Sequence, residues 1–181
     1  MARPNFKRDA YWGVDAEIVY TGLRLLGYYS ALTIILLVVL PPAFIQTTQL
    51  LTADGSAFLT RAAGIPVAQE GILLHLPSIT LQIDFACTAI TIMALYVSLI
   101  LAYRAPWKMR LLGIGVGLPA IVVANLARIV ATAFTAEYAP NLMHTFHDYL
   151  FQVSMVVVAV ALWAWWFSAL NRSASGEARR G

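Results

Sequence analysis

Four long apolar runs, separated by short basic segments, constrain the fold of this chain more than any other feature of its sequence. A helix needs roughly 20 apolar residues to cross about 30 Å of hydrocarbon. The runs at 23–44, 86–103, 111–134 and 149–167 reach or approach that length, and the first ends at Pro41-Pro42, where continued helix is disfavoured. The chain is 60% hydrophobic and 12% charged, which is too apolar for a soluble domain of 181 residues. The sequence therefore predicts an all-α integral membrane protein, a four-helix transmembrane bundle.

The positions of the basic residues predict the orientation of this bundle. Of the 12 Lys and Arg residues, all but Arg61 and Arg128 precede or open the first run, join the second to the third, or follow the fourth. Basic segments stay in the cytoplasm, so we expect both termini there, in a multi-pass protein of the cell membrane. No basic face remains for a nucleic acid. The charged first 20 residues do not resemble a cleavable signal peptide.

A chain of this length fits one domain. We expect a cytoplasmic or interfacial segment at 1–22, a transmembrane domain at 23–170 and a disordered cytoplasmic tail at 171–181. On the extracytoplasmic side, two apolar stretches at 72–76 and 79–83 flank Pro-Ser. Strand-forming residues on both sides of such a break predict a short hairpin that leads into the second run.

Three side chains with reactive chemistry are expected at one depth in the membrane. At 1.5 Å per residue, Cys87 lies about 22 Å from the inner end of its run, Arg128 about 26 Å and His147 about 30 Å. All three therefore fall in the outer leaflet or at its interface. A thiol, a fixed cation and an imidazole are the components of a cysteine acyl-transfer site.

Of these three residues, Arg128 costs the most free energy to place within a membrane span. A guanidinium inside a span costs several kcal/mol unless it is paired or hydrated, although a long side chain can also snorkel to the interface. Asn125 lies three residues earlier on the same helix face and is expected to hold the guanidinium in place. An Asn and an Arg on one intramembrane face favour a functional site.

Cys87 is the only cysteine, so its thiol is either inert packing or reactive. It opens the second run just after a polar turn that contains Asp84. A helix N-terminus and a neighbouring cation both stabilise a thiolate. Thr88 is expected to orient a substrate or cap the helix, and Asp84 to act as an acidic partner or as a cap.

Two of the three histidines lie just before the fourth run. His144 and His147 are three residues apart and can share one helical face, but they match no recognised metal-binding pattern, so no metal or other cofactor is expected. His147, followed by Asp148 as a weak candidate to orient it, is the better general base or acid. His144 and Asp148 are supporting candidates, and His75 in the predicted hairpin is expected to be structural.

The chain resembles the exosortase/archaeosortase family in three short motifs. They are Ala-Cys-Thr-Ala at 86–89, Asn-Leu-Ala-Arg-Ile at 125–129 and His-Asp-Tyr-Leu-Phe-Gln at 147–152. The order Cys, Arg, His and the membrane setting also match, and the resemblance covers roughly residues 64–170. Many members have a glycine where this chain has Ala89, and many have additional spans, so the chain looks like a compact form.

The resemblance implies a membrane-embedded cysteine protease or transpeptidase, with Cys87 as the nucleophile and Arg128 and His147 as its catalytic partners. Its substrates would be secreted proteins whose C-terminus carries a short motif, a transmembrane helix and a basic cluster. The site would face the extracytoplasmic side and cleave that signal through an acyl-enzyme intermediate. The alternative is a non-catalytic four-span assembly or transport component, in which Cys87 is inert and Arg128 serves packing or an ion path.

Overall fold

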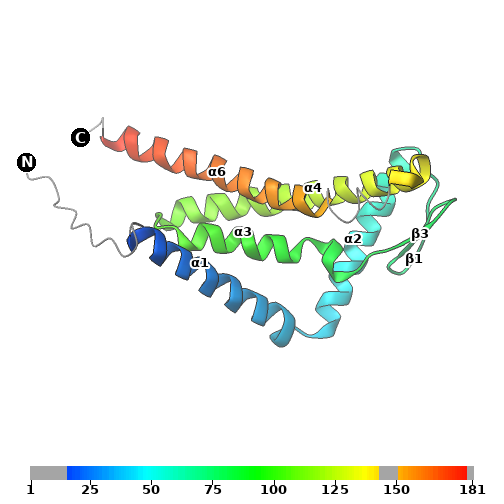
Figure 1. The fold of residues 1–181 in the computed structure, drawn as a ribbon, viewed down its shortest axis with the longest axis horizontal. Helices are drawn as coiled ribbons and strands as arrows, with labels where there is room; N and C mark the ends of the chain where they lie inside the picture. The colour runs from blue at the N-terminus through cyan, green and yellow to red at the C-terminus, as the bar shows by residue number, and fades with distance from the viewer. Residues whose placement is uncertain (1–15, 143–150, 179–181) are drawn as a thin grey trace, which may run out of the picture.

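A computed structural model describes residues 16–142 and 151–178 of the chain (Figure 1). The first helix, α1 (Ala16–Ile34), continues through a π-helical segment, η1 (Ile35–Val39), to a pair of prolines. Proline lacks an N–H and clashes with the preceding turn, so it interrupts a helix but suits its first position. α2 (Pro42–Ala62) accordingly begins at the second proline. The sequence predicted this break, but it did not indicate α2.

Three further helices form the long axis of the molecule. They are α3 (Ile90–Ala102), α4 (Trp107–Tyr138) and α6 (Phe151–Ala178). They lie side by side, and α3 is central because it contacts α1, α4 and α6 (Figure 1). We call the end where residues 103–106 join α3 to α4 the α3–α4 end.

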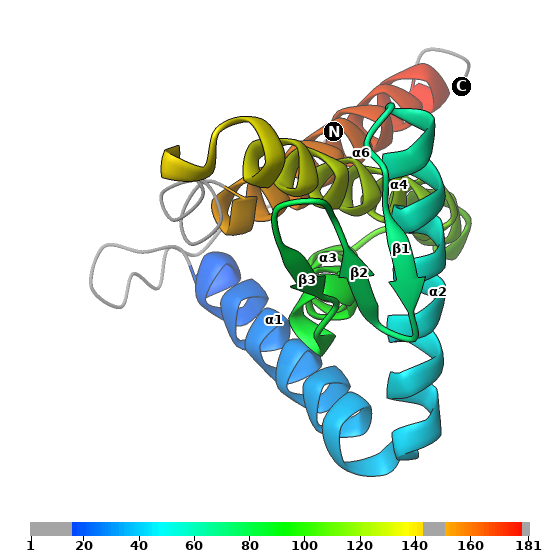
Figure 2. The same ribbon diagram turned by 90° about the vertical axis from the view of Figure 1, so that its right-hand side faces the viewer.

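A small antiparallel sheet lies at the opposite end, which we call the sheet end. Its strands are β1 (Ala68–Glu70), β2 (Leu73–His75) and β3 (Thr80–Gln82), in the order β1-β2-β3. Leu74 pairs with Leu81 across β2 and β3, which confirms the predicted hairpin. Figure 2 views this end, with α2 along one side of the sheet and α3 behind it. Two 3-10 turns, η2 (Phe85–Thr88) and η3 (Pro140–Leu142), complete the described elements.

The hydrophobic core has two parts. Under the sheet, small residues of α2 and side chains of α4 surround Leu74, which is fully buried. Between the long helices, Tyr96, Ile100, Ile121 and Trp166 are fully buried. A Cβ atom at Gly117 would lie 2.2 Å from the Tyr96 ring, so only glycine permits this approach of α3 to α4.

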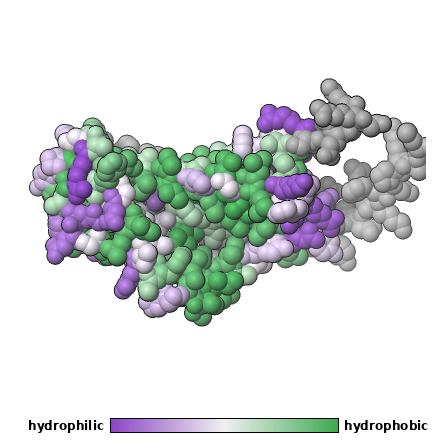
Figure 3. Space-filling model, turned by 180° about the vertical axis from the view of Figure 1, so that it is seen from behind, coloured by the Kyte–Doolittle hydropathy of each residue, from purple (hydrophilic) through white to green (hydrophobic). Residues whose placement is uncertain are grey.

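Within the described residues, three helical stretches are long and apolar enough to cross a membrane, where four spans were predicted. They are Glu17–Val39, Trp107–Tyr138 and Val153–Arg172. The predicted run at 86–103 is instead divided into η2 and α3, and a helix of 13 residues rises only about 20 Å. The four-span bundle is therefore confirmed only in part. Figure 3 shows an apolar middle with polar residues gathered toward both ends.

Two helices extend beyond the predicted boundaries. α1 begins at Ala16, inside the segment at 1–22 that was expected to be separate, and α6 reaches Ala178, inside the predicted tail. Adding a residue to an existing helix adds a hydrogen bond without a new nucleation cost. Helices that start in the apolar region can therefore continue past it.

Candidate active site

Cys87 lies in a tight turn rather than in the first turn of α3. It is the third residue of η2, and its N–H donates a hydrogen bond of 2.9 Å to the carbonyl oxygen of Asp84. The Thr88 hydroxyl donates to the carbonyl oxygen of Phe85 at 2.7 Å, so Thr88 stabilises the turn. The Asp84 carboxylate accepts a hydrogen bond of 2.7 Å from the Gln82 side chain and caps no helix N–H.

Ala89 separates this turn from α3. Its φ of 60° and ψ of 4° place it in the left-handed region, where a Cβ atom crowds the following carbonyl and glycine is preferred. The left-handed residue ends η2 and lets α3 start in a new direction at Ile90. Glycine adopts this conformation without strain, whereas the sequence has alanine here. The left-handed conformation also keeps half-buried Cys87 outside the regular helix.

Asn125 ties this turn to α4. Its side-chain amide donates a hydrogen bond of 2.6 Å to the carbonyl oxygen of Cys87, across 38 residues of sequence. We predicted that Asn125 supports Arg128, but the bonding partner of its amide is the cysteine backbone. Gln49 of α2, which the sequence did not single out, donates to the carbonyl oxygen of Ile83 at 3.1 Å. Two amides from different helices thus hold the backbone around Cys87, one just before η2 and one within it.

Cys87 and Arg128 line one cavity of about 420 Å³, together with Asp84 and Asn125. Met155 and Val156 of α6 and residues of α3 form its apolar walls. Arg128 is half-buried, and its Nε atom is buried with no hydrogen-bond partner among the described residues. A buried guanidinium donor without an acceptor is costly. Arg128 and Cys87 thus both belong to the lining of one cavity, which suits a ligand that brings a carbonyl or carboxylate oxygen.

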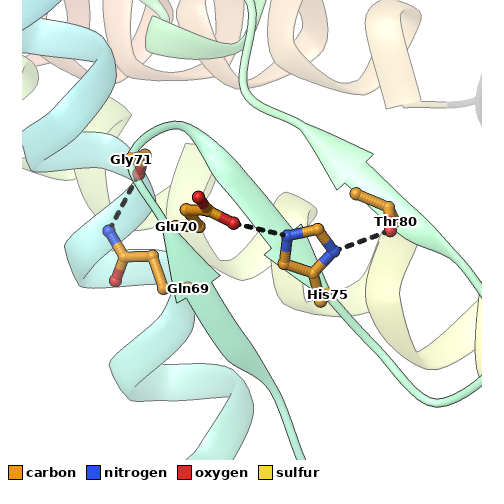
Figure 4. A network of polar contacts seen from close by, with 5 residues as sticks. All are labelled: Gln69, Glu70, Gly71, His75 and Thr80. Atoms are coloured by element: carbon orange, nitrogen blue, oxygen red, sulfur yellow. Dashed lines mark hydrogen bonds and ion pairs between the residues drawn. The ribbon is translucent and has the colours of Figure 1, made fainter.

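Of the three predicted histidine roles, the structure describes only that of His75. His144 and His147, with Asp148, lie outside the described residues. His75 lies in the sheet, where its Nδ1 is 2.9 Å from the Thr80 hydroxyl and its Nε2 is 3.7 Å from a Glu70 carboxylate oxygen (Figure 4). The neighbouring Gln69 amide donates to the Gly71 carbonyl oxygen at 3.2 Å. His75, on β2, thus contacts a side chain of each neighbouring strand, β1 and β3, as expected of a structural residue.

No group of three His, Cys, Asp or Glu side chains that could hold a metal ion occurs in the described parts of the chain. The polar side-chain groups that line the Cys87 cavity are instead a thiol, a carboxylate, a guanidinium, a hydroxyl and two amides. This set can bind and polarise a peptide carbonyl through hydrogen bonds.

A comparison with protein families places the whole helical region in one family. The family model described as transmembrane exosortase matches residues 17–171, which include α1, the sheet and the Cys87 cavity. No curated protein and no solved structure matches the chain.

Proposed function

Since the chain belongs to the transmembrane exosortase family, we propose that it is a cysteine transpeptidase that cleaves C-terminal sorting signals of secreted proteins. The observation that carries this proposal is the shared cavity of Cys87 and Arg128, together with a guanidinium Nε that has no hydrogen-bond partner among residues 16–142 and 151–178. A nucleophile beside an unpaired cationic donor is the minimum arrangement for attack on a carbonyl with stabilisation of the oxyanion.

The reaction would proceed in two steps. The Cys87 thiolate attacks the scissile carbonyl carbon, and the Arg128 guanidinium donates hydrogen bonds to the developing oxyanion. When the tetrahedral intermediate collapses, the C–N bond breaks and a protonated amine leaves. His147 is proposed to take the thiol proton and to give it to that amine. The thioester on Cys87 is then attacked by a second amine or by water, which releases the thiol.

The orientation of the cavity follows from charge. Arg104, Lys108 and Arg110 lie at or near the α3–α4 end, and the cavity lies toward the sheet end. By the positive-inside rule the sheet end would face the extracytoplasmic side of the cell membrane. Secreted proteins expose their C-terminal motif on that side, so thiol and substrate would meet there.

The decisive experiment looks for the acyl-enzyme. A candidate substrate is a protein of the host organism whose C-terminus carries a motif, an apolar span and a basic cluster. We expect mass spectrometry of the purified full chain, quenched in acid during turnover, to find the substrate acyl group on Cys87. Cys87→Ala should leave the precursor uncleaved while the variant accumulates normally. Intact processing in Cys87→Ala cells would instead favour a non-catalytic membrane component.

Arg128 can be tested by a variant that keeps its charge. Arg128→Lys should lower processing at least 100-fold, because an ammonium is a point charge without the planar fork of a guanidinium. Arg104→Lys, an exposed position at the α3–α4 end, is the matched control and should process normally. Wild-type turnover by Arg128→Lys, measured as the rate of precursor loss in pulse-chase labelling, would leave Arg128 with only a general electrostatic role.

A further inference from the structure

A second, larger cavity lies at the α3–α4 end, away from the Cys87 cavity. It has a volume of about 970 Å³ and is formed by α1, α3 and α6. Its walls are mostly apolar, with Leu25 of α1, Leu99 of α3 and Phe167 of α6. Glu17, in the first turn of α1, also lines it. We call this cavity the inner groove.

The inner groove and the Cys87 cavity lie on the same side of the bundle. Ile92 lines the Cys87 cavity and Leu99 lines the inner groove, and residues seven apart share one face of a helix. Val156 and Trp163 repeat this relation on α6. Seven residues correspond to about 10 Å of helix rise. The surface between α3 and α6 therefore connects the Cys87 cavity to the inner groove.

Lipid can cover an apolar surface in a membrane, so apolarity alone does not call for a protein partner. Two other features of the groove favour a protein partner. The groove is hollowed, and Glu17 is the one charged side chain among the described residues that line it. A carboxylate at this position would repel the phosphate of a lipid headgroup but attract a Lys or Arg side chain. Charge complementarity thus favours a helix with a basic end over an anionic lipid.

We propose, on the basis of the transpeptidase function above, that the inner groove binds the transmembrane helix of the substrate and that Glu17 pairs with its basic cluster. Gly22 lies in the groove wall, where a residue without a side chain lets a second helix approach closely. Tyr103, Trp163 and Phe167 line the same end, and their ring faces attract cations. Binding at the groove holds the substrate span beside α3 and α6, with its scissile segment next to Cys87.

A pair of glycine variants tests the groove without disturbing the bundle. A Cβ atom at Gly22 or at Gly27 would meet nothing within 4 Å, so both helix positions accept a larger residue. Gly22→Leu places a side chain in the groove, whereas Gly27→Leu lies on α1 outside it. We expect Gly22→Leu to slow processing of the host substrate at least tenfold and Gly27→Leu to leave it unchanged. Equal rates for the two variants would overturn the proposal.

The ion pair is tested by a double-mutant cycle. Glu17→Gln should slow processing several-fold for a substrate with its basic cluster. It should have no further effect on a substrate whose Lys and Arg residues are changed to Gln. Glu70→Gln, an exposed acid in the sheet with its carboxylate side chain 86% accessible, is the matched control. If Glu17→Gln slows processing by the same factor for both substrates, the pairing is excluded.

Cross-linking separates failure of this docking site from failure of the enzyme proposal. A benzophenone amino acid at Leu25 should capture the substrate, while one at Val123, exposed on α4, should not. Cys87-dependent cleavage without an adduct at Leu25 would refute the groove and leave the enzyme intact. Loss of all Cys87-dependent cleavage would instead refute the proposed function. An adduct with lipid alone would also refute the groove as a substrate site.

Discussion

At the scale of single residues, the conformation of Ala89 decides how Cys87 is presented. A left-handed alanine costs about 1 kcal/mol relative to glycine, and Ala89 is buried at the joint between η2 and α3. Ala89→Gly should therefore raise the free energy of unfolding by up to about 1 kcal/mol and keep processing active. Thermal unfolding of the protein in detergent micelles measures this change.

A helical alanine provides the control for that substitution. Ala94→Gly, buried within α3, should lower the free energy of unfolding by about 1 kcal/mol. Ala89→Val, whose branched side chain is poorly suited to positive φ, should lower it further and impair processing. If Ala89→Gly destabilises as much as Ala94→Gly, the turn does not require a left-handed residue.

The hydrogen bond from Asn125 to the Cys87 carbonyl is the second feature at this scale. Asn125→Asp keeps the size of the side chain but replaces the donor with an acceptor that repels the carbonyl oxygen. We expect processing to fall at least tenfold while the variant stays folded. The rate at which Cys87 is alkylated should also differ from that of the wild-type protein, because Asn125 is a positioning residue for the turn. Normal alkylation and processing rates in Asn125→Asp would contradict this role.

Sequence reasoning brought Cys87 and Arg128 to one depth, and the structure places both at one cavity. Helical rise converts sequence distance into depth, so this part of the site was predictable. The partner of Asn125 was not, because it depends on a left-handed residue at a position where the sequence has alanine. Gln49 was missed for a similar reason, since its contact needs α2, whose position is set by tertiary packing.

At the scale of elements, glycines in α4 set the distances between helices. The Tyr96 hydroxyl donates to the Gly113 carbonyl oxygen at 2.9 Å, and its ring lies over Gly117. Gly117→Ala should lower the free energy of unfolding by about 2 kcal/mol, because the added methyl group overlaps a fully buried ring. Unfolding in detergent with increasing denaturant gives the change in stability.

Gly115 is the matched control, because a Cβ atom there meets nothing within 4 Å. Gly115→Ala should be neutral or stabilising by up to about 1 kcal/mol, as alanine has the higher helix propensity. In a Tyr96→Leu background the cost of Gly117→Ala should shrink. A cost that persists in that background would mean that Tyr96 is not the residue that requires glycine.

The elements that sequence reasoning predicted are those with local causes. The break at Pro41 and Pro42 follows from proline chemistry, and the β2–β3 hairpin from apolar residues around Pro77 and Ser78. α2 mixes polar and small residues, and it is held by packing of Ala53 and Ala57 in the core shared with α4. No local sequence pattern indicates such a helix. The division of the second run into η2 and α3 likewise depends on one backbone conformation rather than on hydropathy.

At the scale of the whole molecule, three of the described helices are long and apolar enough to cross a membrane, and the shorter α3 contacts α1, α4 and α6. α3 rises only about 20 Å, less than the roughly 30 Å of hydrocarbon, so we expect its N-terminal turn to lie below the membrane surface. The Cys87 cavity is lined by residues of α3, α4 and α6, whereas the sheet lies beyond the N-terminal end of α3 (Figure 1). A site at this depth suits a peptide bond close to the end of a substrate span.

The orientation of the whole molecule can be tested with its own cysteine. Because Cys87 is the only cysteine, a membrane-impermeant maleimide needs no engineered background to report on the sheet end. We expect it to label Cys87 in intact cells, since the cavity opens toward the extracytoplasmic side under the positive-inside orientation. In a Cys87→Ala background, a cysteine at exposed Lys108 should label only after the membrane is permeabilised. The opposite pattern, with Lys108→Cys labelled from outside and Cys87 protected, would place the nucleophile in the cytoplasm, where secreted substrates do not expose their C-terminal motif.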